Sequence, residues 1–344
     1  MNLSLFDYDL PAKLIAQSPS AKRDSSRLLV FDRTCKIAQD SYFNQLPSFL
    51  DQETLVVVND SKVYPARLFG KRKTGGKVEL LLTKNLGGGR FSALIKPLSK
   101  LRVGEDIYIA NESCRLIASS ESGVATIEFK SAKIPFRLAD EIGQTPLPPY
   151  IKRERDATTK MDRLRYQSLF AKVRGSCAAP TASLHFTKGL IDRLLAKKIE
   201  IVPITLHVGP SVFRPIRAKA VDQERLDSES ILISEDAAMK INQARAQSKK
   251  IVAIGTTVTR ALESQFDRKT NSLKAINGET SLFIKEPFKF NIVDHLVTNF
   301  HLPKSSLLLL VAAFATRGDI LAQYKRAIAN EYRFYSFGDA MLIL

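Results

Sequence analysis

The stretch "ETLVVVNDSKV" at residues 53–63 decides the fold, because it separates two different kinds of sequence. Its apolar run ends at Asn59-Asp60, and this pattern predicts a buried strand that ends in a polar turn. From residue 64 to about residue 148 the chain reads as short strands and turns, whereas both flanking segments mix helical and extended patterns. We therefore expect one domain to be inserted into another directly after this strand.

The inserted segment predicts a small antiparallel β-barrel. The run "ARLFGKRKTGGKVELLLTK" (66–84) has the pattern of two strands joined by a Thr-Gly-Gly turn. Further short strands are indicated in "RFSALIKP", "EDIYIA", "CRLIASS" and "VATIEFK", with Gly, Ser or Asn in the breaks. Many short strands at near-regular spacing are typical of such a barrel. We assign it to residues 64–148.

The remaining residues, 1–63 and 149–344, predict a layered α/β/α domain. Thr187 is expected to cap a helix at 188–198 and Ser234 a helix at 235–247, each followed by a strand. A last helix is expected at 319–332. Alternation of strands and helices indicates an α/β architecture, in which ligands bind at loops beyond the strand ends.

The charge of the chain points to a polyanion as partner. Its 344 residues carry a net charge of +17, which favours nucleic acid first and an anionic membrane second. The longest apolar run, "SLLLLVAAFA" (306–315), is too short to span a bilayer, and we interpret it as a buried helix. No membrane partner is expected.

The amino terminus and the cysteines predict a cytoplasmic protein. The opening "MNLSLFDYDLPAKL" lacks the basic and apolar regions of a signal peptide. The three cysteines, Cys35, Cys114 and Cys177, lie far apart, which argues against both a disulfide framework and a structural zinc site. A small buried side chain is the favoured interpretation of Cys177.

Two basic segments predict contacts with RNA phosphates. One lies at residues 152–174, where Tyr166 and Phe170 interleave with the basic side chains and Tyr150 lies just before them, and the other is the hairpin "RLFGKRKTGGK" (67–77). The alternative is that both runs are solvated faces. The candidate tRNA-binding residues are Lys71, Arg72, Lys73, Lys152 and Arg153.

Histidines mark the candidate catalytic stretches. "PTASLHF" (180–186) combines Thr181 with His185, and "TLHVG" (205–209) combines Thr205 with His207. An imidazole suits proton transfer near neutral pH. The alternative is a hydrogen-bonded core histidine at a strand end. His301 lies in "TNFHLPKS" (298–305), where a turn and a helix cap by Ser305 also explain the pattern. The HExxH spacing is absent, so no metal site is expected.

A strand, a glycine turn and a helix are predicted by "VAIGTTVTR" (252–260). Free amides at Gly255, Thr256 and Thr257 would hold an anion, a carboxylate or ribose hydroxyls at the helix amino terminus. The alternative is that Thr256 serves only as the N-cap of the helix.

Taken in order, these stretches closely resemble one enzyme family. The series "FDYDLPAKLIAQSP", "NDSKVYPARLFGKRKTGGKVELLL", "AAPTASLHFT", "TLHVG", "GTTVTRALE", "TNFHLPKS" and "YRFYSFGDAMLI" is similar to the S-adenosylmethionine:tRNA ribosyltransferase-isomerases of queuosine biosynthesis. The resemblance runs from residue 6 to the carboxyl terminus. It also implies an α/β domain with an inserted β-barrel.

The resemblance implies a transferase that uses S-adenosylmethionine as a ribosyl donor. The acceptor would be 7-aminomethyl-7-deazaguanine at the wobble position of tRNA, and the products would be epoxyqueuosine, adenine and methionine. S-adenosylmethionine would be a co-substrate, and no resident cofactor is expected. We expect a monomer.

The resemblance also assigns candidate roles to residues of this chain. His185 and His207 would supply the general acid and base, in unassigned order. Asn59, Thr181 and Thr205 would position the ribose, and the amides of Gly255, Thr256 and Thr257 would hold the methionine carboxylate. The remaining candidates for substrate binding, without a sharper role, are Arg67, Arg260, Asn299, His301, Arg333 and Asp339.

The chain departs from the family pattern at four places. Ser183 and Thr316 stand where glycine is usual, and Pro210-Ser211-Val212 replaces "AGT". The segment "ERLDSE" (224–229) replaces "HxMHSE", so two histidines are missing. Two alternatives follow: a tRNA-binding relative that has lost catalysis, or a tRNA-modifying enzyme with an altered donor or acceptor.

Overall fold

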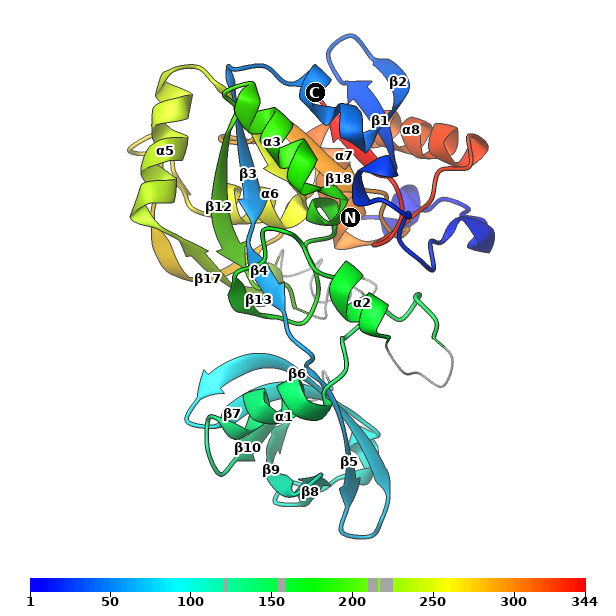
Figure 1. The fold of residues 1–344 in the computed structure, drawn as a ribbon, viewed down its shortest axis with the longest axis vertical. Coiled ribbons are helices and arrows are strands. Elements are labelled where there is room, and N and C mark those ends of the chain that lie inside the picture. The colour runs from blue at the N-terminus through cyan, green and yellow to red at the C-terminus, as the bar shows by residue number, and fades with distance from the viewer. Residues whose placement is uncertain (121–122, 154–158, 210–215, 217–224) are drawn as a thin grey trace.

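Figure 1 shows an α/β unit joined to a smaller barrel. The computed structural model describes residues 1–120, 123–153, 159–209, 216 and 225–344. The predicted fold class, a layered α/β structure with an inserted antiparallel barrel, is confirmed. The barrel strands lie between residues 67 and 129, inside the range assigned to the inserted domain. The domain boundaries themselves stay a prediction.

The α/β unit is built on a nine-stranded sheet with the order β17-β13-β12-β3-β14-β18-β19-β1-β2. The strand predicted at the start of the sequence is β3, whose six residues are all buried. Its neighbours β12 and β14 are parallel to it, and β18 is parallel to β14. The strands are β1 (Arg27–Asp32), β2 (Ile37–Tyr42), β3 (Thr54–Asn59), β12 (Glu200–Leu206), β13 (Arg225–Ile233), β14 (Lys250–Ile254), β17 (Ile276–Leu282), β18 (His295–Asn299) and β19 (Ala340–Ile343).

Helices cover both faces of this sheet, because successive strand residues point to opposite sides. Val57 and Ala253 pack in one core with α5 (Glu235–Ala246), α6 (Thr256–Ser264), α7 (Ser306–Phe314) and α8 (Arg317–Ala329). Val56 and Val252 pack in the other with α3 (Lys188–Ala196) and the 3-10 helices η4 (Phe43–Phe49) and η7 (Thr181–His185).

The N-caps of three helices are the residues predicted from the sequence. Thr187, Ser234 and Ser305 each accept a backbone N–H three residues further on, as predicted. The last helix, α8, begins at Arg317 and not at residue 319, because the Thr316 hydroxyl accepts the Asp319 amide. The apolar run at 306–315 forms α7, and most of its side chains are buried.

The barrel closes with six antiparallel strands in the order β10-β7-β6-β5-β8-β9. Alternate residues such as Leu80, Leu82 and Ile127 fill its interior, and helix α1 (Ile134–Ile142) packs against β5. The strands are β5 (Arg67–Arg72), β6 (Lys77–Gly87), β7 (Arg90–Lys96), β8 (Asp106–Ile109), β9 (Glu112–Ser119) and β10 (Val124–Phe129).

A narrow waist joins the two units (Figure 1). There β4 (Ser61–Val63) pairs in parallel with β11 (Val173–Ser176), next to α2 (Lys160–Arg165). The remaining elements are η1 (Leu3–Phe6), η2 (Ala12–Leu14), η3 (Arg23–Ser25), η5 (Leu98–Lys100), β15 (Phe266–Asp267) and β16 (Ser272–Leu273).

No single helix in the described part of the chain has the length and apolarity needed to cross a membrane. The helices α7 and α8 meet that requirement only when counted together, and they are bent by 112° at the break between them.

Candidate functional site

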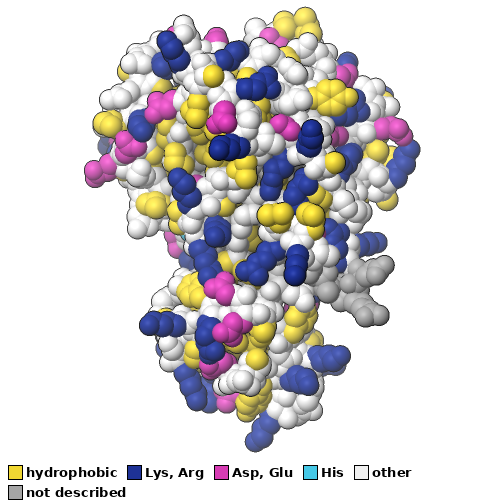
Figure 2. All heavy atoms as spheres, in the orientation of Figure 1, with side chains coloured by type: hydrophobic (Ala, Val, Ile, Leu, Met, Phe, Trp, Pro, Cys, Tyr) yellow, Lys and Arg dark blue, Asp and Glu magenta, His cyan; other side chains and the backbone are white. Residues whose placement is uncertain are grey.

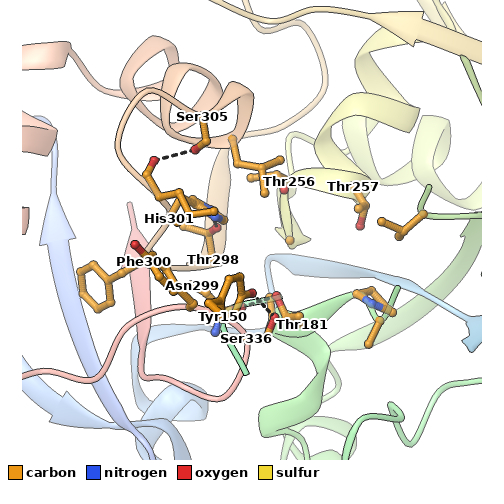
Figure 3. Close-up of a pocket in the computed structure, with 18 residues that line it drawn as sticks. Tyr150, Thr181, Thr256, Thr257, Thr298, Asn299, Phe300, His301, Ser305 and Ser336 are labelled. Carbon is orange, nitrogen blue, oxygen red and sulfur yellow. Dashed lines mark hydrogen bonds between the residues drawn. The ribbon is translucent and has the colours of Figure 1, made fainter. Parts of the chain in front are cut away.

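A cavity opens beyond the carboxyl ends of β14 and β18, beside η7 (Figure 3). Four threonines line it, Thr181, Thr256, Thr257 and Thr298, and we call it the threonine cavity. The hollow, including the part that is open to solvent, has a volume of about 650 Å³. It lies where an α/β sheet is expected to bind its ligand.

The amino terminus of α6 points free amides toward this cavity. Gly255 is the N-cap, with a φ of +100° that favours glycine, and its own amide binds the carbonyl of Val297 at 2.8 Å. The first intrahelical bond runs from the Thr259 amide to the Gly255 carbonyl, so the amides of Thr256, Thr257 and Val258 are available to a ligand. The alternative interpretation of Thr256 as the N-cap is wrong, because Gly255 is the N-cap and Thr256 is the first residue of the helix.

Opposite α6 (Figure 3), Thr181 and Asn299 form a hydrogen-bonded pair at the cavity wall. The Thr181 hydroxyl donates to Asn299 Oδ1 at 2.7 Å. Behind them, Asn299 Nδ2 donates to His185 Nε2 at 3.1 Å, so His185 Nδ1 carries the proton and donates to Ser26 Oγ at 3.0 Å. His185 thus fixes the orientation of the Asn299 amide.

His185 is itself a core residue. It is 3% exposed, its ring stacks on Phe43, and both ring nitrogens are bonded to protein. Burial lowers the pKa of His185 to about 4, so the ring is neutral at pH 7. In this arrangement the imidazole does not line the threonine cavity.

His301 does line the cavity. Its Nε2 lies 2.7 Å from the Thr298 hydroxyl, and its backbone is held by Tyr324, which accepts from the amide, and by Tyr8, which donates to the carbonyl. Burial lowers the pKa of His301 to about 3. A neutral ring in this place can hydrogen-bond a ligand but does not carry a positive charge.

The stretches 180–186 and 205–209 meet at the threonine cavity, but their two histidines do not. Thr181 and Val208 line it, whereas His207, one residue before Val208, lines a second cavity. This junction cavity, of about 1250 Å³, lies between the barrel and the ends of β12 and β13. An ion pair between Lys84 of the barrel and Glu279 of β17 spans the same junction.

His207 keeps one ring nitrogen available. Its Nδ1 lies 2.7 Å from the Ser61 hydroxyl, and its Nε2 has no partner among the residues that the structure describes. Burial lowers the pKa of His207, and the nearby Asp60 carboxylate opposes that shift. Asp227 lines the same cavity, at a position where the family pattern has histidine.

Asn59 and Thr205 bind protein groups and lie outside the lining of the threonine cavity. Asn59 Nδ2 donates to the Leu206 carbonyl and to Thr257 Oγ1, and its Oδ1 accepts the amides of Ser61 and Leu206. These bonds tie the end of β3 to β12 and to the start of α6. The Thr205 hydroxyl donates to Asp60 Oδ1 at 2.6 Å, while burial raises the pKa of that carboxyl.

Arg260 forms a buried ion pair with Glu229 beside the junction cavity. Both side chains are under 5% exposed. Glu229 Oε1 also accepts the Gly209 amide at 2.8 Å, and Arg260 Nε donates to the Leu282 carbonyl at 3.0 Å. The pair therefore holds the chain just after His207. Glu229 was not among the candidates predicted from the sequence, although a buried arginine implies a carboxylate partner.

Three other candidates hold the scaffold and line neither the threonine cavity nor the junction cavity. The Asp339 carboxylate accepts the amides of Arg27 and Arg333. The Arg333 guanidinium donates to Ser20 Oγ and to the carbonyls of Ser18 and Phe337. On the barrel, Arg67 forms a two-point ion pair with Glu79, at 2.8 and 3.1 Å.

The candidate tRNA-binding residues divide into exposed lysines and paired arginines. Lys71, Lys73 and Lys152 are exposed and have no ion pair among the described residues. Arg72 binds Glu105 and Arg153 binds Asp162, in both cases through two nitrogens. The charge of each arginine is thus largely neutralised inside the protein.

The structure also shows the surroundings of Cys177 and of the residues that depart from the family pattern. Burial raises the pKa of the Cys177 thiol to about 12, which fits a small buried side chain. Ser183 is fully buried, and its hydroxyl has no partner among the described residues. The unusual Thr316 caps α8. The departures at Pro210-Ser211-Val212 and Glu224 lie outside the described residues.

Two comparisons agree with the motif series. A family model described as "Queuosine biosynthesis protein" matches residues 3–343. The crystal structure of an S-adenosylmethionine tRNA ribosyltransferase from Thermotoga maritima is similar over 99% of this chain and 100% of that one, at 33% sequence identity and a TM-score of 0.57. The matches thus extend over both the barrel and the α/β unit.

Proposed function

Because this chain belongs to the queuosine biosynthesis protein family, we propose that it is an S-adenosylmethionine-dependent tRNA ribosyltransferase. In the proposed reaction the ribosyl unit moves to the aminomethyl group of 7-aminomethyl-7-deazaguanine at the tRNA wobble position. Isomerisation gives epoxyqueuosine, and adenine and methionine leave. S-adenosylmethionine is a co-substrate, and the proposal includes no metal ion or resident cofactor.

The observation that carries this proposal is the amino terminus of α6 facing the Thr181–Asn299 pair across the threonine cavity. The amides of Thr256, Thr257 and Val258 suit the methionine carboxylate, because free N–H groups and the helix dipole both favour an anion. Thr181 Oγ1 and the Asn299 amide suit ribose hydroxyls. Asn59 acts one step behind, through its bond to Thr257.

The proton transfers are assigned to the neighbourhood of His207. The positive sulfonium acidifies the adjacent C5′ hydrogens, so a base near neutrality can remove one, and the departing adenine needs an acid. Of the two histidines proposed for these roles, His207 faces the junction cavity with an Nε2 that has no partner among the described residues, whereas His185 has both nitrogens bonded to protein. The next residue, Val208, lines the threonine cavity, so His207 lies at the boundary between the two cavities. His185 is therefore proposed as a positioning residue, acting through Asn299.

The proposed tRNA contacts include the exposed Lys71 and Lys73 at the barrel hairpin and Lys152 beside α2. Arg72 and Arg153 are proposed to shape these surfaces through their ion pairs with Glu105 and Asp162. Arg67 and the Arg333–Asp339 contact are proposed to support the site through the scaffold.

The decisive experiment supplies both substrates. The protein is incubated with S-adenosylmethionine and tRNA that bears 7-aminomethyl-7-deazaguanine, and adenine, methionine and the modified nucleoside are measured by liquid chromatography and mass spectrometry. Adenine release that depends on the tRNA, with epoxyqueuosine in the product, supports the proposal. Tight tRNA binding without adenine would identify a relative that has lost catalysis. Adenine release with a different nucleoside product would identify an altered donor or acceptor.

A further inference from the structure

We propose that a basic groove at the waist of the molecule binds the sugar–phosphate backbone of RNA. This proposal rests on the proposed function, because it takes tRNA as the substrate. The waist groove, of about 1080 Å³, is lined by α2, by the β4–β11 pair and by residues of α1 and its flanks. Figure 2 shows Lys and Arg side chains gathered at this waist.

The lining of the groove is strongly one-sided in charge. Its five basic residues are Arg23, Lys62, Arg163, Lys172 and Arg174, and Asp140 is its single acidic residue in the described part of the chain. Because five positive charges face one negative charge, the described part of the lining carries a net charge of +4. A concave surface of this sign concentrates polyanions.

Three of these five basic side chains are exposed and form no ion pair with the residues that the structure describes. Arg174 binds Asp140 at 2.8 Å, which neutralises both. Lys62, Arg163 and Lys172 are exposed and form no ion pair within the described residues. The pairing of β4 with β11 places Lys62 directly opposite Arg174. Lys62 therefore lies beside an arginine whose charge is already balanced by Asp140, and its own charge is left for a ligand.

The shape of the groove favours a polymer over a small anion. The waist groove and the junction cavity share Tyr64 and Arg174, so the two hollows adjoin. A nucleotide whose base enters the junction cavity toward His207 therefore leaves its neighbouring phosphates beside Lys62 and Lys172. This continuity favours RNA over an acidic protein segment, which would have no reason to reach the same cavity.

The test compares two charge-reversed variants of equal charge change. Lys62→Glu/Lys172→Glu alters the groove. Lys269→Glu/Lys289→Glu alters two exposed lysines near backbone segments that Arg245 of α5 binds. Binding of a fluorescent, unmodified tRNA is measured by anisotropy across a salt series. The groove variant is expected to bind at least about tenfold more weakly and to lose about 2 from the log–log salt slope, since each lost phosphate contact contributes about 0.9.

Several outcomes are decisive. If the groove variant loses no more affinity than the control, or keeps the parent salt slope, the proposal is wrong. The neutral variant Lys62→Gln/Lys172→Gln covers the case in which charge reversal disturbs folding. Thermal unfolding and S-adenosylmethionine binding check that this variant is folded. If the proposal holds, it shows the same loss of salt slope. Polyglutamate that binds as tightly, with the same dependence on both lysines, would overturn RNA in favour of an acidic protein.

The binding assay is independent of turnover. If the parent protein releases no adenine but its tRNA affinity depends on the groove lysines, the proposed reaction fails and the groove assignment stands. If adenine is released normally while groove variants bind like the control, the groove assignment alone fails.

Discussion

The imidazole of His207 lies directly against the backbone of Gly175. A methyl group built on Gly175 would come within 2.5 Å of both Nε2 and Cε1 of that ring, closer than any real van der Waals contact. Gly175 belongs to β11 and His207 follows β12, so this contact links the waist of the molecule to the junction cavity.

Gly175→Ala is therefore expected to displace His207 and to lower the rate of adenine release by about 100-fold, because misplacement of about 1 Å can cost that much. S-adenosylmethionine binding should change little. Gly189→Ala in α3 is the matched control, since a methyl group there meets nothing within 4 Å. Single-turnover assays on both proteins make the comparison. Normal turnover by the Gly175 variant would show that the position of His207 is unimportant.

His207→Gln and His185→Gln are expected to fail in different ways. Glutamine retains hydrogen bonding but cannot shuttle a proton at neutral pH. His207→Gln should keep a near-normal melting temperature and lose about 100- to 10,000-fold in rate. His185→Gln should instead lower stability by about 1–3 kcal/mol, because the buried groups of Ser26 and Asn299 lose their partner. Adenine release and thermal unfolding are measured on both; parent-like turnover by both would assign the proton chemistry to another group.

Thr257→Glu is expected to weaken S-adenosylmethionine binding at least about tenfold, or 1.4 kcal/mol, by placing a carboxylate beside the ligand's own. Thr257→Ser should retain most of the affinity, because it keeps the hydroxyl that Asn59 binds and the proposal assigns the ligand contact to backbone amides. Thr270→Glu, on an exposed turn, is the control for the added charge. Calorimetric titration gives the three affinities. Unchanged binding by the Thr257→Glu variant would place the methionine end elsewhere.

Breaking the buried Arg260–Glu229 ion pair is expected to lower the free energy of unfolding more than breaking an ion pair at the surface. Glu229→Gln leaves a buried guanidinium without a counter-charge and should cost about 3–5 kcal/mol. Glu229→Leu/Arg260→Met removes both charges and should recover much of that loss. The exposed Lys13–Glu331 pair is the control, and Glu331→Gln should have no measurable effect. Urea unfolding gives each free energy; equal effects of Glu229→Gln and Glu331→Gln would contradict the prediction.

The loops of the threonine cavity were predictable from sequence, because short-range signals mark them. Pro180 and Gly255 each lie at a turn, and Asn299 is the last residue of strand β18. Such signals locate strand ends, and strand ends converge in an α/β sheet. The same local logic placed the caps of α3, α5 and α7.

The direction of individual side chains was not predictable in this way. Val208 faces the threonine cavity and His207 the junction cavity, and one residue of register decides which of them does so. The partner of Arg260 depends on where β13 lies in the sheet, which is a non-local contact. The number of basic residues likewise made Arg72 and Arg153 candidates for tRNA binding, but it did not show that they form ion pairs with Glu105 and Asp162.

The buried histidines predict how stability depends on pH. Burial lowers the pKa of His185 to about 4 and that of His301 to about 3, so each is neutral when folded. Below about pH 6.5 the unfolded chain binds protons that the folded chain excludes. The contribution of these two histidines to stability therefore falls as the pH drops from about 6.5 toward 4, by about 1.4 kcal/mol per pH unit for each histidine.

His301→Gln isolates one of these contributions. The free energy of unfolding in urea is measured at about pH 7, 6 and 5 for the parent and the variant. Burial raises the pKa of Asp60 and Asp339; these carboxyls act in the opposite direction, but equally in both proteins. Between about pH 6 and 5, the parent should therefore lose about 1.4 kcal/mol more than the variant, whatever their stabilities at neutral pH. Identical pH slopes would mean that His301 accepts a proton in the folded state as readily as in the unfolded chain.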